Sequence, residues 1–209
     1  METAIQTIAV YAIPVLLAIT LHEASHGYVS RMFGDNTAYM LGRVTLNPIK
    51  HIDPIGTVVL PLAMALFTPF IFGWAKPVPV NFANLRHPKR DMIWVAAAGP
   101  GVNLLMAVLW AIAFSALRTF GVEERFFFEM ARAGVQVNLV IMALNLLPLP
   151  PLDGGRIMAG LLPNKLSIAY SRIEPFGLFI IVGLLVTGAL GFVLQPFLAF
   201  GESIVGLFV

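Results

Sequence analysis

Five long stretches of the chain contain no charged residue, and they constrain the fold more than any other feature. Asp, Glu, Lys and Arg are absent from residues 3–22, 54–75, 92–117, 133–152 and 175–201. A membrane-spanning helix needs about 20 mainly apolar residues, and each stretch is long enough. Charged residues make up 11% of the chain, whereas soluble domains average roughly 25%. The sequence therefore predicts an all-helical, polytopic membrane protein.

Charge and cysteine content exclude several classes of function. The net charge is +2 and the longest basic run is Lys89-Arg90, so a nucleic-acid-binding surface has no support. Without cysteine there is no disulfide framework and no thiolate metal site. Residues 3–22 follow no basic leader and precede no small-residue cleavage site, so we expect a retained span rather than a signal peptide. We expect one membrane-embedded domain over residues 1–209, with its motifs in residues 4–156 and a helical C-terminal region at 157–209.

The strongest chemical motif closes the first apolar stretch, where His22, Glu23 and His26 form an H-E-x-x-H pattern. Residues four apart lie on one face of a helix, so both imidazoles can bind one ion. Glu23 can then reach a water molecule on that ion and act as a general base. Three ionisable groups at bilayer depth are costly unless they function. A hydrolytic zinc site is therefore favoured over polar groups that snorkel at a helix end.

A catalytic zinc site usually has three protein ligands, so one more ligand must come from elsewhere. His51 and His87 lie in charged, loop-like stretches, and we expect both to be solvated. Asp153 follows three prolines within residues 148–151, which must break the fourth span. A carboxylate at the end of a broken span can point sideways at an ion. The alternative is an Asp that caps the next helix at the membrane surface.

Together these motifs resemble the site-2 protease family of intramembrane zinc metalloproteases, in a short form without a PDZ or CBS domain. The resemblance covers residues 22–156. The matching motifs are His22-Glu23-x-x-His26, Gly99-Pro100-x-x-Asn103, and Asn145 followed by Leu152-Asp153-Gly154. The family implies one zinc ion held by His22, His26 and Asp153, with Glu23 as the catalytic base and Asn145 near the substrate carbonyl.

The resemblance implies an intramembrane zinc endopeptidase that cleaves the transmembrane segment of another membrane protein. One alternative is a divalent-metal transporter, which would need ligands along a path through the bilayer; here the ionisable groups cluster near one face. A second alternative is an inactive binding protein of the same fold, and the intact Glu23 argues against it. Homo-oligomer formation is left open.

The distribution of basic residues predicts the topology. If residues 54–75 cross the bilayer once, the loops on the two faces carry nearly equal numbers of Lys and Arg. If residues 54–75 enter and leave by one face, ten of the 13 Lys and Arg residues lie on that face. Cytoplasmic loops carry an excess of Lys and Arg, so we expect a re-entrant segment at 54–75 and about four to six spanning helices. The predicted protein is a multi-pass protein of the plasma or inner membrane, with a cytoplasmic active site and the N-terminus outside.

Two short stretches, residues 41–46 and 76–80, have the composition of β-strands and flank the re-entrant segment. A protease must bind its substrate in an extended form, and adding the substrate as a further strand would hold it so. Lys76, Val78 and Val80 are therefore candidate substrate-binding residues near the active site. The two prolines of this stretch limit one edge for pairing, and a plain interfacial loop is the alternative.

Three asparagines lie in apolar stretches and are expected to face protein rather than lipid. Asn138 and Asn145 are seven residues apart and share one helix face. Asn145 is a candidate catalytic residue because of its place in the family motif. Asn103 is a candidate substrate-binding residue, although a polar contact between helices is an equally good interpretation of Asn103 and Asn138.

Overall fold

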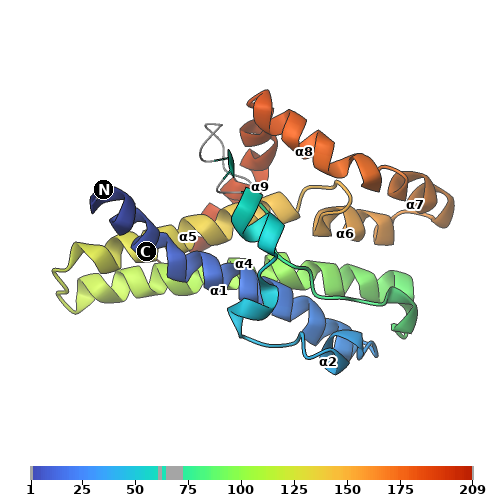
Figure 1. The fold of residues 1–209 in the computed structure, drawn as a ribbon, viewed down its shortest axis with the longest axis horizontal. Coiled ribbons are helices and arrows are strands. Elements are labelled where there is room, and N and C mark those ends of the chain that lie inside the picture. The colour runs from blue at the N-terminus through green and yellow to red at the C-terminus, as the bar shows by residue number, and fades with distance from the viewer. Residues whose placement is uncertain (1, 61–62, 65–72, 209) are drawn as a thin grey trace.

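The structure is a computed structural model that describes residues 2–60, 63–64 and 73–208. Three long helices of this part lie side by side: α1 (Glu2–Met32), α4 (Pro88–Thr119) and α5 (Arg125–Asn145). Helices α1 and α5 run in one direction and α4 runs in the other (Figure 1). The described residues form helices and loops and contain no β-strand, which confirms the predicted all-helical class.

Shorter helices connect and surround these three. Between α1 and α4 lie α2 (Thr37–Met40), η1 (Pro48–His51), η2 (Pro54–Val59) and η3 (Phe82–Asn84). After α5 come α6 (Asp153–Leu161), α7 (Asn164–Ser171), η4 (Glu174–Phe176), α8 (Gly177–Val186) and α9 (Ala189–Val205). The apolar stretch 175–201 is thus divided between α8 and α9, because Gly188 between them has a positive φ of 75° that favours glycine.

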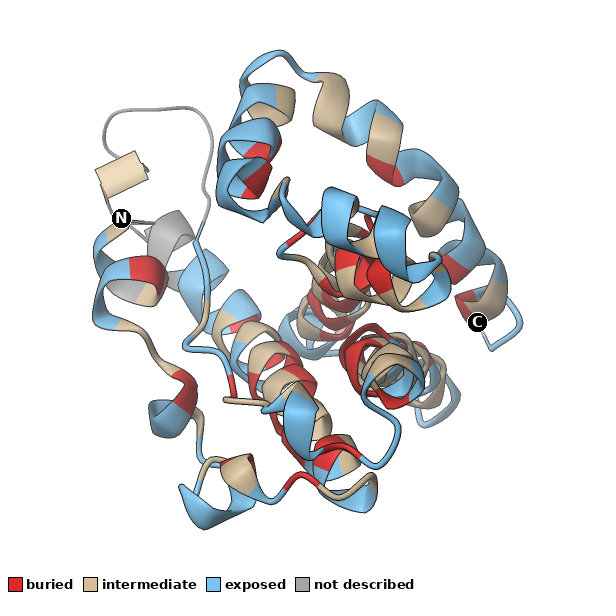
Figure 2. Ribbon diagram, turned by 90° about the vertical axis from the view of Figure 1, so that its right-hand side faces the viewer, coloured by how far each residue is buried: buried red, intermediate tan, exposed pale blue. Residues whose placement is uncertain are grey.

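Small residues allow the long helices to pack closely. Ala107 and Ala111 of α4 are fully buried against Leu139 and Met142 of α5. A Cβ atom at Gly134 would lie 2.3 Å from the indole of Trp110. Close van der Waals fit between small residues is what holds helices together in a bilayer. Buried residues accordingly concentrate where the helices face one another, and the outward faces are exposed (Figure 2).

Among the described residues, four helices are long and apolar enough to cross a membrane. They are Gln6–Met32, Pro88–Thr119, Arg125–Asn145 and Asn164–Val186, the last being the run of α7, η4 and α8 taken together. This number falls within the predicted range and supports a membrane protein. The fourth predicted stretch, 133–152, is shorter as a helix because α5 ends at Asn145, ahead of the prolines.

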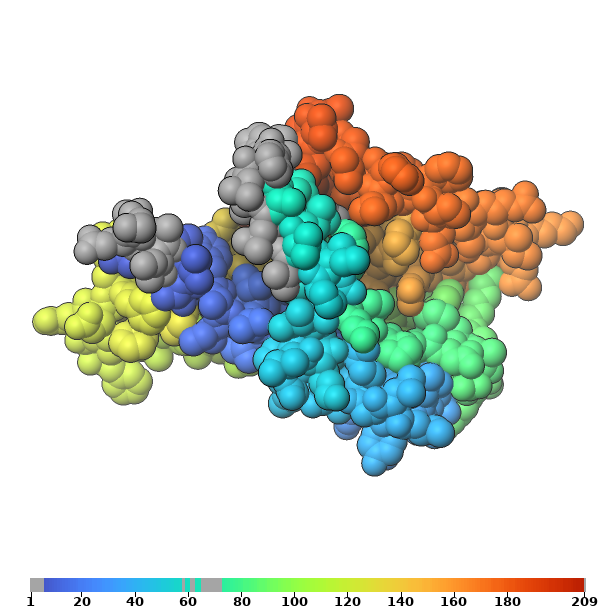
Figure 3. Space-filling model, viewed as in Figure 1, coloured from blue at the N-terminus to red at the C-terminus, as the bar shows by residue number. Residues whose placement is uncertain are grey.

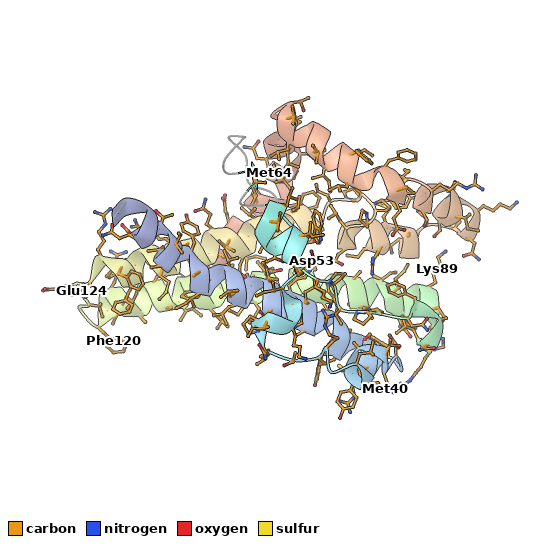
Figure 4. All side chains as sticks on the ribbon, in the orientation of Figure 1. Met40, Asp53, Met64, Lys89, Phe120 and Glu124 are labelled. Atoms are coloured by element: carbon orange, nitrogen blue, oxygen red, sulfur yellow. The ribbon has the colours of Figure 1, made fainter. Side chains whose placement is uncertain are left out.

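The segment between α1 and α4 leaves and returns at the same end of the bundle. The N–H of Arg86 donates a hydrogen bond to the carbonyl of Phe33, at 3.0 Å. Figure 4 places Met40 and Lys89 toward this end, and Phe120 and Glu124 at the opposite end. This path agrees with the predicted re-entrant segment, but residues 61–62 and 65–72 lie outside the described residues. Entry of this segment into the bilayer therefore stays a prediction.

Asp35 joins the end of α1 to the residues that precede α4. Its side chain is fully buried and accepts hydrogen bonds from the N–H of Asn81 at 2.8 Å, from the amide of Asn84, and from Thr37. Burial raises the pKa of the Asp35 carboxyl, but these hydrogen bonds outweigh it and hold the pKa below its usual value. A charged carboxylate thus fixes the last residue of the extended segment 73–81 and the η3 turn that follows it.

The predicted β element is not found in the described part of the chain. Residues 41–46 form turns and bends, and residues 73–81 are extended without a partner strand. The N–H of Lys76 donates to the carbonyl of His51, at 2.9 Å, and the N–H of Val78 donates to Glu23. Proline has no N–H, so Pro77 and Pro79 offer no donor on the other edge. The alternation in sequence was therefore not sufficient to build a ladder.

Single cysteines at Lys50, His87 and Glu123 test the topology, because the chain has no native cysteine to give background labelling. All three positions are exposed. We expect Lys50→Cys and His87→Cys to react with a membrane-impermeant thiol reagent from the cytoplasmic side, and Glu123→Cys from the opposite side. Labelling of positions 50 and 87 from opposite faces would contradict the re-entrant topology.

Candidate metal centre

The fold brings the three predicted metal ligands together. His22 and His26 lie one turn apart on α1, and Asp153 is the first residue of α6. The two Nε2 atoms are 3.1 Å apart, and Asp153 Oδ2 lies 3.2 Å from His22 Nε2 and 3.3 Å from His26 Nε2. All three side chains are about nine-tenths buried. Leu152 occupies the N-cap position of α6, so the geometry does not favour the alternative role of Asp153 as a helix cap.

The opposite nitrogen of each histidine shows which ring atom carries the hydrogen. His26 Nδ1 lies 2.8 Å from the carbonyl oxygen of Val95, and His22 Nδ1 lies 2.6 Å from Oδ1 of Asn103. Carbonyl oxygens only accept hydrogen bonds, so each Nδ1 must be the donor. In the neutral imidazole the other nitrogen then keeps its lone pair. Both Nε2 atoms therefore present lone pairs to each other and to Asp153.

This convergence of acceptors fits a cation. Asp153 Oδ2 is buried and accepts no hydrogen bond within the described part of the chain. Three lone-pair atoms at 3.1 to 3.3 Å from one another repel unless a positive charge lies among them. A tetrahedral zinc ion with bonds of about 2.0–2.1 Å holds its ligand atoms about 3.3 Å apart. Two imidazoles and one carboxylate also match the donor set of catalytic zinc sites, which leave a fourth position open.

Helix α4 passes directly behind both rings, and Gly99 makes this approach possible. A Cβ atom at Gly99 would lie 2.5 Å from His22 Cε1 and 2.6 Å from His26 Nε2. Val95 lies one turn before Gly99 and Asn103 lies one turn after it, so one face of α4 contacts both ligands. The groups packed against Gly99 are therefore the two imidazole rings.

Glu23 lies beside the three predicted metal ligands and is not part of their cluster. It is half-buried and lines the same cleft as His22 and His26. Its Oε2 atom accepts a hydrogen bond from the N–H of Val78, at 2.8 Å. The extended segment 73–81 thus contacts the carboxylate predicted to act as the base.

The cleft has a volume of about 640 Å³ and is lined mainly by apolar side chains. Its walls come from α1, η2, the extended segment, α4, α5, α6 and α8, with Trp74, Val78, Asn145, Arg156 and Ile181 among the lining residues. Figure 3 shows residues near 50 (cyan) over α1, and the α7–α8 arm (orange) standing apart from them with α6 visible between. Such a cleft is large enough for a few residues of an extended peptide.

Of the remaining predicted site residues, some line the cleft and others do not. Val78 and Val80 line the cleft, whereas the Lys76 side chain is exposed and is not part of its lining. Asn145 lines the cleft, and its amide donates a hydrogen bond to the carbonyl of Ile141, at 3.0 Å. Asn103 is fully buried behind His22 and does not line the cleft. In this geometry Asn103 contacts a predicted metal ligand, His22, and does not face the cleft.

Sequence reasoning missed two groups at this centre and misplaced one histidine. The Val95 carbonyl has no sequence signature, because every residue carries one. Arg156 lines the cleft three residues after Asp153, where its charge in an otherwise apolar surrounding was a usable signal. His51 was expected to be solvated but is 1% exposed, because its Nε2 bonds to the carbonyl of Thr45 at 3.0 Å and folds the loop inward. His87 is exposed, as predicted.

Comparison with known proteins identifies relatives over nearly the whole chain. A protein of Bacillus subtilis (strain 168), named "Putative zinc metalloprotease YwhC", is 38% identical over 202 residues, which cover 94% of this chain and 89% of the relative. A protein of Mycolicibacterium smegmatis, named "Putative zinc metalloprotease Rip2", is 30% identical over 178 residues, 84% of this chain and 66% of the relative. The Rip2 protein of Mycobacterium tuberculosis (strain H37Rv) is 32% identical over 180 residues, 82% of this chain and 63% of the relative.

The chain thus spans less than two thirds of either Rip2 protein, but almost all of YwhC. No family model matches the chain, and no solved structure matches it. The relationship to YwhC indicates a zinc metalloprotease, and the cluster of His22, His26 and Asp153 is compatible with the zinc ion of such an enzyme. The chain therefore belongs to the family of zinc metalloproteases that includes YwhC of Bacillus subtilis.

Proposed function

We propose that this protein is an intramembrane zinc endopeptidase of the site-2 protease type, which cleaves the transmembrane segment of another membrane protein. One observation carries the proposal. The cluster of His22, His26 and Asp153 opens into a cleft among helices that are apolar enough to cross a bilayer. A peptide bond cleaved in this cleft would lie at membrane depth.

The chain's own residues divide the work of peptide hydrolysis. His22, His26 and Asp153 would hold the zinc ion, which when bound acidifies the attacking water and polarises the scissile carbonyl. Glu23 accepts the proton of the attacking water and passes it to the leaving amine. The bond from the Val78 N–H holds one oxygen of Glu23 and so orients the carboxylate. Asn145 donates a hydrogen bond to the developing oxyanion.

The substrate is proposed to bind in an extended form beside residues 76–80. A helical substrate hides its carbonyls in internal hydrogen bonds, so the segment that is cut must unwind. Val78 and Val80 line the cleft and supply apolar contacts. The N–H groups of Lys76 and Val78 are already engaged, and Pro77 and Pro79 have none. Arg43 already donates to the carbonyls of Lys76 and Pro77. Substrate pairing here would therefore use the remaining carbonyl groups of the segment as acceptors of substrate N–H groups.

The proposed setting is the plasma or inner membrane, with several spans, the N-terminus outside and the active site toward the cytoplasm. It is supported by the ten Lys and Arg residues in the loops on one predicted face, and by the return of residues 33–87 to one end of the bundle. A metal transporter is not favoured, because the relatives are named zinc metalloproteases. Self-association stays a prediction.

The substitution Glu23→Gln tests the catalytic mechanism. We expect turnover of single-pass membrane substrates by the detergent-purified protein to fall by at least about 100-fold, because a positioned general base contributes this much or more. Zinc content per chain should stay near the wild-type value, since Glu23 is not a ligand. The matched control is Glu124→Gln, at an exposed position at the far end of the bundle. Loss of zinc would make Glu23 a ligand, and unchanged turnover would remove the protease mechanism.

Substitutions of Asp153 test the third ligand. We expect Asp153→Ala to lower both zinc affinity and turnover, because two imidazoles alone hold the ion weakly. Asp153→Asn should be nearly as harmful, since it keeps the volume but removes the charge that offsets the dication. Asp153→His should recover part of the zinc binding, because imidazole is also a good zinc ligand. Zinc content and turnover across the three variants are the measurements. Full zinc occupancy and activity in Asp153→Asn would refute the assignment.

A further inference from the structure

We infer that Asn138 is a positioning residue that acts through Asn103 to hold the His22 imidazole in its metal-binding form. The inference rests on the proposed metal centre and concerns how one of its ligands is oriented. Neither asparagine lines the cleft, so neither is placed to touch a substrate.

The three residues form a chain of hydrogen bonds across the centre of the bundle, with one member from each long helix. His22 Nδ1 of α1 lies 2.6 Å from Oδ1 of Asn103 on α4. Nδ2 of Asn103 donates to Oδ1 of Asn138 on α5, at 3.0 Å. Nδ2 of Asn138 donates to the carbonyl of Gly134, at 2.8 Å. Both asparagine side chains are fully buried, and each of their polar atoms has a partner.

The Gly134 carbonyl, at the end of this series of hydrogen bonds, determines which group donates in each bond. The Gly134 carbonyl can only accept, so the amide nitrogen of Asn138 must face it and Oδ1 must face Asn103. That oxygen also only accepts, so Asn103 must turn its own nitrogen toward it. The oxygen of Asn103 is then the atom left facing His22. Since this oxygen is an acceptor, Nδ1 of His22 carries the hydrogen and Nε2 keeps the lone pair that binds metal.

The second contact of Asn103 is weaker than the first. Its Nδ2 atom also donates to the carbonyl of Ala18, but at 3.3 Å rather than 3.0 Å. Without Asn138, this longer bond alone would favour the correct orientation of the Asn103 amide. We therefore expect the loss of Asn138 to weaken the hold on His22, and the loss of Asn103 to remove it.

The other histidine has no comparable side chain behind it. His26 donates to the main-chain carbonyl of Val95, at 2.8 Å, and a side-chain substitution cannot remove that group. The two ligands are thus held by different means, and the buried asparagines serve His22 alone. Burying two side-chain amides at bilayer depth costs free energy unless their hydrogen bonds are satisfied. The hydrogen bonds from His22 through Asn103 to Asn138 satisfy both amides and also orient the His22 ring.

The experiment measures zinc affinity of the purified full chain by competition with a chelator, together with the visible absorption spectrum of the Co²⁺-substituted protein. We expect Asn103→Leu to weaken zinc binding by about 10- to 100-fold, the usual effect of losing a partner of a ligating histidine. Asn138→Leu should weaken it by a smaller factor, and both should change the Co²⁺ spectrum. The double variant should match Asn103→Leu alone, because Asn138 acts only through Asn103.

The matched control is Ser30→Ala, since Ser30 is also fully buried, lies on α1, and its hydroxyl donates a hydrogen bond to the carbonyl of Gly27 and not to a metal-centre residue. This variant should keep wild-type zinc affinity and the wild-type spectrum. If Asn138→Leu does not fold, as judged by thermal unfolding of the metal-free protein, Asn138→Ala removes the same oxygen without added bulk and carries the test.

Two results would overturn the inference: additive losses of affinity in the double variant, or wild-type affinity and spectrum in the Asn138 variant. The readout separates this inference from the proposed function. If the wild-type protein binds zinc but cleaves no membrane substrate, the protease proposal fails and the positioning role can still be confirmed. If the wild-type protein cleaves its substrate while the variants keep full zinc affinity, the positioning role fails alone.

Discussion

Two imidazole nitrogens and one carboxylate oxygen converge inside the helix bundle, and this convergence constrains the packing around it. The Nε2 atoms of His22 and His26 and the Oδ2 atom of Asp153 lie within 3.3 Å of one another. Without a cation they repel, and burial in a low-dielectric interior makes that repulsion costly. The packing that forces them together must therefore be supplied by the remainder of the fold, and a bound dication would return that cost as binding free energy.

Helix α4 contributes to this packing from a single face. Val95, Gly99 and Asn103 follow one another at intervals of one turn. The Val95 carbonyl orients the His26 ring and the Asn103 amide orients the His22 ring. Gly99 has no side chain and so leaves room for both rings. Val95 and Asn103 are buried, where water does not compete for their hydrogen bonds, so these contacts orient the two rings more strictly than they would at a solvated surface. The extended segment 73–81 acts on the other side, where Val78 bonds to Glu23.

The parts of the site that obey a local rule could be predicted, and the parts that depend on how helices rotate could not. The spacing of His22 and His26 sets their shared face, and the proline break before Asp153 frees that residue to point inward. Asn103 was recognisable as a polar residue in an apolar span, but the rotation of α4 decides that it meets His22 rather than the cleft. The alternation in residues 76–80 suggested a strand. It could not show that the N–H groups of Lys76 and Val78 donate hydrogen bonds to His51 and Glu23 instead of to a neighbouring strand.

The contact between Gly99 and the two imidazoles also affects how related sequences can be judged. A methyl group at this position would overlap both rings, so even alanine is incompatible with this arrangement of the ligands. A homologue that keeps both histidines, the glutamate and the aspartate but carries a larger residue at the position of Gly99 would have the residues for hydrolysis without the space to arrange them. Pseudoenzymes of this kind would pass any search based on ligand residues alone, and this one small position on the neighbouring helix would distinguish them.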